Sequence, residues 1–224
     1  MASHRDRSRR RRRPVLVPVS LLVAAAGLAV AAFLGGFAEA PPEAPPTLGK
    51  GATLDQVRIR TTFEDAVVRP GGQDGIGIPD KRYLQIHMKV TNLSDETVSA
   101  FSVVNAAIPT VRADGKVIKG RELDDLGPRI VIKNSAQVLN QIHPRVTQPV
   151  VMAFELAPNS TPPRQVELDA ATFEWREGFF NETFSWQIVT DEIPPPPGGA
   201  RSDAQYVPHV AAKVNLPVRV EDGR

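Results

Sequence analysis

The chain of 224 residues contains no cysteine. This absence excludes disulfide bonds, thiolate metal sites and cysteine nucleophiles. Aromatic residues make up only 6% of the sequence, whereas 21 prolines interrupt it. This composition favours a loop-rich β domain over a helical one. Without disulfides, such a domain has to be stabilised by its own hydrophobic core.

The sequence also lacks the motifs that organise common catalytic and metal sites. Its histidines are scattered, without the spacing of a zinc protease, and no G-x-S-x-G segment presents a serine nucleophile. The glycine-rich segment 71–80 lacks the acidic ligands of a calcium loop and the lysine of a phosphate loop. We therefore expect no enzyme activity, catalytic residue, metal or cofactor. His87, on the polar side of an alternating segment, is expected to be an exposed surface residue. The four histidines are His4, His87, His143 and His209.

Positive charge is concentrated at one end of the chain. Residues 1–13 hold seven of the 27 basic residues and one of the 25 acidic residues, so the remainder carries 20 basic and 24 acidic side chains. The isoelectric point near 9.1 therefore reflects the arginine-rich end. Since the rest of the chain has no basic stripe, we predict no nucleic-acid partner.

An uncharged apolar run, Val15 to Phe37, follows the arginines directly. As an α-helix it would span about 34 Å, enough for a hydrocarbon core of about 30 Å. The positive-inside rule then predicts a cytoplasmic N-terminus and an extracytoplasmic C-terminal part. We assign residues 1–14 to a cytoplasmic tail and 15–38 to an uncleaved transmembrane signal anchor. The membrane-anchoring charges, which would contact lipid headgroups, are Arg9, Arg10, Arg11, Arg12 and Arg13.

Two other interpretations of this region stay open. Ala38-Glu39-Ala40 fits a signal-peptidase site, and cleavage after Ala40 would release a secreted domain. Against cleavage, the apolar run is longer than the 7–15 or so residues of a signal peptide, and Pro41 would follow the cut. The Arg12-Arg13 pair also fits a twin-arginine export signal, although any arginine run before an apolar segment gives this match.

Beyond residue 51, apolar and polar residues alternate with the period of two that is typical of β-strands. In the clearest segment, 82–91, Leu84, Ile86, Met88 and Val90 share one face. One apolar and one polar face indicate antiparallel sheets, and many short strands indicate an all-β sandwich. No segment predicts a further important helix. Other alternating segments are 57–64, 150–156, 166–168 and 184–188.

The remaining segments define the domain limits. Residues 39–51 are rich in proline and alanine and predict a stiff linker; residues 52–192 would form the sandwich. Residues 193–206, with consecutive prolines and glycines, predict a loop. Residues 207–224 alternate again, from Val210 to Val220, and predict a last strand. Because Pro217 cannot donate a ladder hydrogen bond, we expect an edge strand.

Two segments together resemble one family. In 83–98, an aliphatic strand is followed by Asn92, a turn and the pair Asp95-Glu96; in 138–158, His143-Pro144 precedes a second aliphatic strand that ends at Pro158. These segments resemble the telokin-like, immunoglobulin-like extracytoplasmic domains of unknown function in bacterial lipoproteins and membrane-anchored proteins. Secreted mycobacterial immunoprotective antigens share that fold. The resemblance spans roughly residues 57–189 and implies an immunoglobulin-like antiparallel β-sandwich without catalytic residues. It departs at Arg145, where the family has glycine, and in the longer segment 120–141.

The most aromatic stretch, 174–181, supplies the candidate contact residues. Trp175, Phe179 and Phe180 lie near a turn at Gly178, and exposed aromatic side chains mark interfaces. Trp186, which alternates inward, is expected in the core. We predict a single-pass membrane protein that displays its domain outside the cell for envelope binding or scaffolding. Its partners would be membrane lipids and an unidentified envelope protein. The alternatives are a cleaved secreted domain and an envelope hydrolase or metal-dependent enzyme, such as one with a Ser-His-Asp triad from distant residues.

Overall fold

The computed structural model describes residues 44–72, 76–118, 127–133, 140–178, 183–196 and 204–221. The chain divides into two units, residues 1–44 and 45–224, and the description below concerns the second. The predicted tail and anchor, residues 1–38, therefore lie outside the described residues. Among the described residues, no helix is long and apolar enough to cross a membrane.

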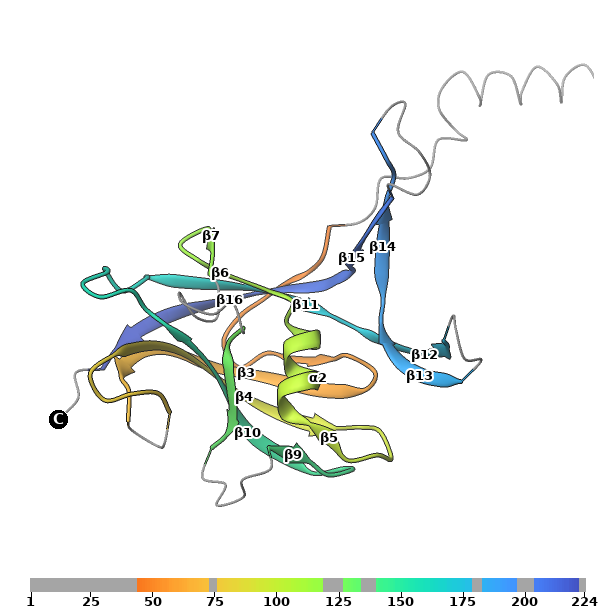
Figure 1. Ribbon diagram of the computed structural model, residues 1–224, viewed down its shortest axis with the longest axis horizontal. Helices are drawn as coiled ribbons and strands as arrows, with labels where there is room; N and C mark the ends of the chain where they lie inside the picture. The colour runs from red at the N-terminus through yellow and green to blue at the C-terminus, as the bar shows by residue number, and fades with distance from the viewer. Residues whose placement is uncertain are drawn as a thin grey trace, which may run out of the picture. The chain divides into compact units, whose positions relative to one another are not determined.

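Within the described ranges the chain forms a ten-stranded mixed sheet (Figure 1). Its strands are β1 (Thr47–Leu48), β2 (Thr53–Asp55), β3 (Ile59–Pro70), β4 (Arg82–Asn92), β6 (Thr110–Ala113), β7 (Lys116–Val117), β8 (Arg129–Ile132), β10 (Thr147–Glu155), β11 (Gln165–Ala171) and β16 (Val210–Val220). They follow the order β7-β6-β11-β16-β3-β4-β10-β8, with β1 added to β16 and β2 to β3. Three two-stranded sheets complete the fold: β5 (Val98–Ser99) with β9 (Gln141–Ile142), β12 (Phe173–Glu177) with β13 (Phe184–Ile188), and β14 (Thr190–Ile193) with β15 (Gln205–Pro208).

The large sheet curls, and the hydrophobic core lies between its two halves. Leu168 and Leu216 from one half belong to the same buried cluster as Phe63, Leu84 and Met152 from the other. The described structure is mostly β, as predicted, but one ten-stranded mixed sheet and three small sheets replace the expected immunoglobulin-like sandwich of antiparallel sheets. The reason is β16, which pairs antiparallel with β11 and then, from Val218 to Val220, parallel with β3.

The alternation in β4 predicts its core face correctly, but the prediction for the opposite face is wrong. Leu84, Ile86, Met88 and Val90 are buried as expected, yet Tyr83 and Gln85 are buried as well and His87 is half-buried. For Tyr83 the cause is the loop between β3 and β4, because Ile76 packs on its side chain. Gly77, at φ +77°, is needed there, since a Cβ atom would lie 2.2 Å from the Tyr83 ring.

The C-terminal strand β16 is confirmed as a strand but is not an edge strand. It lies between β11 and β3, and Ala212, Val214 and Leu216 are fully buried. Pro217 is tolerated there for a local reason. The amide of Val218 donates to the carbonyl of Arg164, just before β11, so the nitrogen of the preceding Pro217 points the opposite way. On that side, pairing with β1 stops at Val214 and pairing with β3 starts only at Val218, so no ladder bond is lost.

A short helix, α2 (Ala100–Ala107), was not predicted. Ser99 caps it by accepting a hydrogen bond from the amide of Ser102, and its buried face packs near β8 and β11. Eight residues give barely two turns, too few for the helical period to stand out in the sequence. Its buried residues are Ala100, Val103, Val104 and Ala107.

Candidate binding surface

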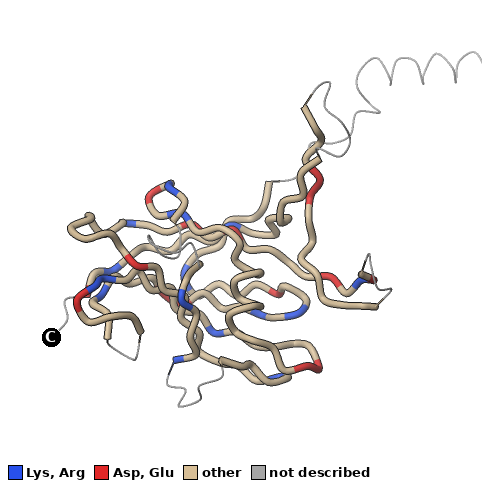
Figure 2. Tube along the Cα trace, in the orientation of Figure 1, with Lys and Arg blue, Asp and Glu red and all other residues tan. Residues whose placement is uncertain are grey.

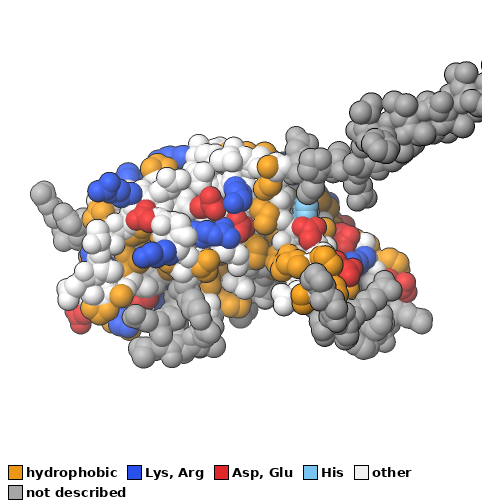
Figure 3. All heavy atoms as spheres, turned by 90° about the horizontal axis from the view of Figure 1, so that it is seen from above, with side chains coloured by type: hydrophobic (Ala, Val, Ile, Leu, Met, Phe, Trp, Pro, Cys, Tyr) orange, Lys and Arg blue, Asp and Glu red, His pale blue; other side chains and the backbone are white. Residues whose placement is uncertain are grey.

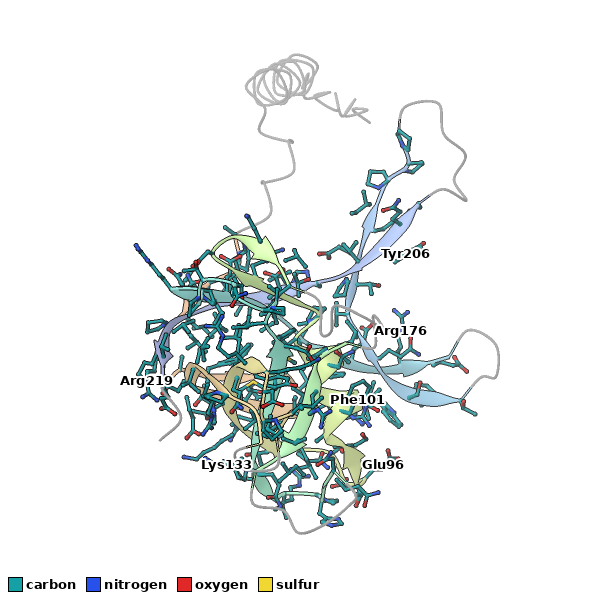
Figure 4. The ribbon with its side chains drawn as sticks, turned by 60° about the vertical axis from the view of Figure 1, so that its left-hand side comes forward. Glu96, Phe101, Lys133, Arg176, Tyr206 and Arg219 are labelled. Atoms are coloured by element: carbon teal, nitrogen blue, oxygen red, sulfur yellow. The ribbon has the colours of Figure 1, made fainter. Side chains whose placement is uncertain are left out.

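Two hairpins, β12–β13 and β14–β15, extend from the large sheet (Figures 1 and 4). They arise where β11 and β16, paired up to Ala171 and Val210, diverge into β12 and β15. Residues 184–193 bridge the gap. The Val189 amide donates to Thr172 O (3.0 Å), and its carbonyl accepts from the His209 amide (2.8 Å). β13 and β14 thus act as one strand, here called the bridging strand, paired first with β12 and then with β15.

One face of the β12–β13 hairpin is aromatic. The register places Phe173 opposite Ile188, Trp175 opposite Trp186 and Glu177 opposite Phe184, so these side chains share a face. Trp175 packs edge-on against Trp186, with ring centroids 5.4 Å apart, and stacks with Phe184 at 6.4 Å. We call Phe173, Trp175, Phe184, Trp186 and Ile188 the aromatic face.

The residues of the aromatic face become more exposed with distance from the core. Phe173 is buried in the core, and Trp186 and Ile188 are partly buried against it. Towards the hairpin tip, however, Trp175 is 49% and Phe184 58% exposed. Exposed aromatic side chains that are held in place by their neighbours can contact a partner at a small entropic cost.

The opposite face of the same hairpin is polar. Arg176 donates to Glu174 (2.9 Å) and to the Gln187 side chain (2.9 Å) on the neighbouring strand. Figure 4 shows Arg176 on this hairpin and Tyr206 on the next one. On the face seen in Figure 3, and along the trace in Figure 2, acidic and basic residues are interspersed. Among the described residues of this hairpin, the exposed apolar side chains are therefore grouped on the aromatic face.

A strained turn borders the aromatic face. The Arg58 amide donates to Gln56 O (2.9 Å) across Val57, which has φ +70° and is 53% exposed. This is a classic γ-turn, a rare conformation that is especially unfavourable for a β-branched residue. The buried Gln56 holds the turn in place, since its side-chain amide donates to Ala107 O and Ala171 O. Backbone strain of this kind often occurs at functional sites.

Arg58, the residue after the turn, connects it to the aromatic face. Its guanidinium lies 5.9 Å from the ring centroid of Phe173 and 6.0 Å from that of Trp186. Both distances fit cation–π interactions. Burial lowers the pKa of Arg58 below its ordinary value, partly opposed by the charge of Glu96. Arg58 thus links the strained turn to the inner rings of the aromatic face.

The predicted site residues fall into two groups. Trp175 is exposed and lies on the aromatic face, as the sequence predicts for a contact residue. Phe179 and Phe180, like Arg9 to Arg13, lie outside the described residues. Trp186 packs against the core but is only partly buried. Sequence reasoning missed Phe184 and Val57 as surface residues: alternation assigns Phe184 to an inward face, and no motif marks Val57.

A second polar cluster lies on the outer face of β3 and β4. Arg69 Nε donates to Gln85 Oε1 (2.8 Å), and Arg69 Nη2 lies 3.3 Å from His87 Nε2. Burial lowers the pKa of His87, and the charges of Arg69 and Lys133 lower it further. The described residues include no group of three or more histidine, aspartate or glutamate side chains placed to hold a metal ion. The cluster is thus a group of polar side chains on this face of the sheet, and its titratable group is His87.

Comparison with known proteins identifies no family. No family model matches the chain, and no curated protein matches it. A "putative lipoprotein" from Staphylococcus aureus is similar at a TM-score of 0.37 and 13% identity, over 78% of this chain and 96% of that one. An uncharacterised β-sandwich protein from Clostridium difficile is similar at a TM-score of 0.38 and 9% identity, over 67% and 97%. These scores are too low to support an inference, so the resemblance to telokin-like domains stays a prediction.

Proposed function

We propose that this protein is a single-pass membrane protein of the bacterial cell envelope, which displays its β domain on the extracytoplasmic side and binds or scaffolds other envelope components. It catalyses no reaction. The observation that carries this proposal is the junction of seven arginines in residues 1–13 with the uncharged run from Val15 to Phe37. A run of this length fits the bilayer, and the arginines set its orientation.

The way the chain joins the β domain supports a short tether. Pro46 O accepts a hydrogen bond from the amide of Lys213, and β1 then pairs with β16. Only residues 38–45 remain between the apolar run and this attachment. Eight residues span at most about 28 Å when fully extended. A domain held this close to the membrane suits binding to neighbouring envelope components.

The aromatic face supports a binding role. Trp175 and Phe184 expose about half of their surface, and Trp175 packs against Trp186, which lies beside Arg58. Supported aromatic side chains are typical of binding hot spots. The alternatives are a cleaved secreted domain, which would keep the same aromatic face, and an envelope hydrolase or metal-dependent enzyme, for which the described residues offer no group of three or more metal-ligating side chains.

Fractionation with mass measurement of the mature chain tests the anchor. We expect the protein in the membrane fraction, resistant to alkaline extraction, with residues 15–38 retained. Replacing Ala40 by Leu, which would block a signal-peptidase site, should leave the size of the protein unchanged. A mature N-terminus at Pro41, or full-size protein in the culture medium, would refute the anchor.

A further inference from the structure

We propose that the bridging strand, residues 184–193, is a docking edge that accepts an extended segment of another polypeptide as an added β-strand. This inference deepens the binding role proposed above and does not depend on the membrane anchor. It names the chemistry of the partner: a backbone in strand conformation, with apolar residues at alternate positions.

The hydrogen-bond pattern shows which backbone groups are open. Gly178 donates to Thr183 O, Val189 donates to Thr172 O, and the His209 amide donates to Val189 O. Antiparallel pairs alternate between bonded and non-bonded positions, so the odd-numbered residues from 183 to 193 face β12 and β15. The even-numbered residues face the other edge, where no hydrogen bond joins them to any described residue. They are Phe184, Trp186, Ile188, Thr190 and Glu192.

Apart from the charge of Glu192 near one end, this edge lacks the features by which proteins protect exposed strands. Natural edges carry prolines, lysines or bulges that prevent pairing with another chain. The outer edge of β15 has Pro208, and the outer edge of β12 is engaged where the amide of Phe173 donates to Gln56 O. The bridging strand has no proline or lysine, and both of its pairings keep a regular register. Because the outer edges of β12 and β15 are protected and this edge is not, we infer that it pairs with a strand of another polypeptide.

The side chains next to the edge favour a particular strand. Because Phe184, Trp186 and Ile188 point to one face, an added strand would place every second side chain beside the aromatic face. Acidic residues lie near both ends of this surface, with Glu177 of β12 opposite Phe184 and Glu192 at the other end of the bridging strand. A segment with apolar residues in alternation and a basic residue at each end fits this surface. A second copy of the same strand would instead bring further acidic side chains to these ends.

Amide exchange measured by NMR tests the edge directly. The probe is a synthetic peptide of about ten residues, alternating valine and threonine with a lysine at each end, added to the full-length protein in lipid nanodiscs. The even-numbered amides from Phe184 to Glu192 should then exchange about tenfold more slowly. The odd-numbered amides, already bonded to β12 and β15, should not change. A peptide of equal composition with its valines in one block should bind more weakly.

A proline substitution provides the matched test by mutation. Thr190→Pro removes one outward amide without breaking a bond to β15, and should weaken peptide binding about tenfold. Thr190→Val keeps the amide and should bind like the wild type. Circular dichroism checks that both variants fold.

Three results would overturn the inference. The first is equal slowing of odd and even amides, and the second is equal affinity of the two Thr190 variants. The third is protection of the even amides without peptide that increases with protein concentration, since this would assign the edge to a second copy of the chain. A chain released into the medium would refute the anchor and leave the alternating exchange pattern intact, so the two proposals fail separately.

Discussion

At the scale of single residues, Val57 carries the clearest conformational strain. A β-branched residue at positive φ costs about 1–3 kcal/mol, and the cost is borne because Gln56 and Asp55 fix the turn. Val57→Gly should therefore raise the free energy of unfolding by about 1 kcal/mol, after the entropic cost of glycine. Urea denaturation measures it.

Val117→Gly is the matched control, since Val117 is also exposed but lies in β7 without positive φ. The free energy of unfolding of this variant should fall by up to about 1 kcal/mol. If both glycine variants were destabilised equally, Val57 would not be strained.

His87 is the titratable group of the polar cluster on the outer face of β3 and β4. Burial, together with Arg69 and Lys133, lowers its pKa below the ordinary value near 6.5, so the unfolded chain binds this proton more readily than the folded one. The contribution of His87 to stability is complete above pH 6.5 and is lost as the pH falls through its lowered pKa. His87→Gln should flatten the decline in stability below pH 6.5, as measured by thermal unfolding across pH 4 to 8.

An unchanged decline in stability for His87→Gln would contradict this prediction, and His87 would then titrate like a surface histidine, as the sequence alone predicts.

At the scale of elements, alternation predicts which segments form strands, but not which strands and loops lie beside them. It correctly gives β4 its buried side chains, because a period of two depends only on local sequence. It does not predict that Ile76 covers the opposite face, or that β16 lies between β11 and β3, since both depend on distant parts of the chain. The candidate surface shows the same limit. Trp175 can be recognised because its segment is rich in aromatic residues. The open edge of the bridging strand can be recognised only once its pairing is known.

The central position of β16 changes what a truncation should do. Ala212, Val214 and Leu216 fill the core between the two halves of the sheet, and the backbone of β16 bonds to both β11 and β3. Removing residues 205–224 should therefore abolish cooperative unfolding, rather than only lower the melting temperature as the loss of an edge strand would. Calorimetry distinguishes the two results.

The control for this truncation removes only residues 222–224, which follow the last described residue. Its melting temperature should equal that of the full chain. A chain without residues 205–224 that still melts cooperatively would show that β16 is dispensable.

At the scale of the whole molecule, a membrane anchor predicted from the sequence precedes the β domain. The domain begins its pairing at Thr47, ten residues after the apolar run ends at Phe37. Its aromatic face and open edge are surfaces through which a tethered domain can bind a neighbouring polypeptide. The orientation of the chain across the membrane is therefore the property to test first, because it decides which compartment supplies that partner.

The absence of cysteine makes this orientation directly measurable. A single cysteine introduced as Ser102→Cys lies on the exposed side of α2, and one introduced as Ser8→Cys lies among the N-terminal arginines. Intact cells are treated with a membrane-impermeant maleimide, and the labelling of each variant is compared with that after permeabilisation. The account predicts that Ser102→Cys is labelled in intact cells and Ser8→Cys only after permeabilisation. Labelling of Ser8→Cys in intact cells, with Ser102→Cys protected, would contradict it.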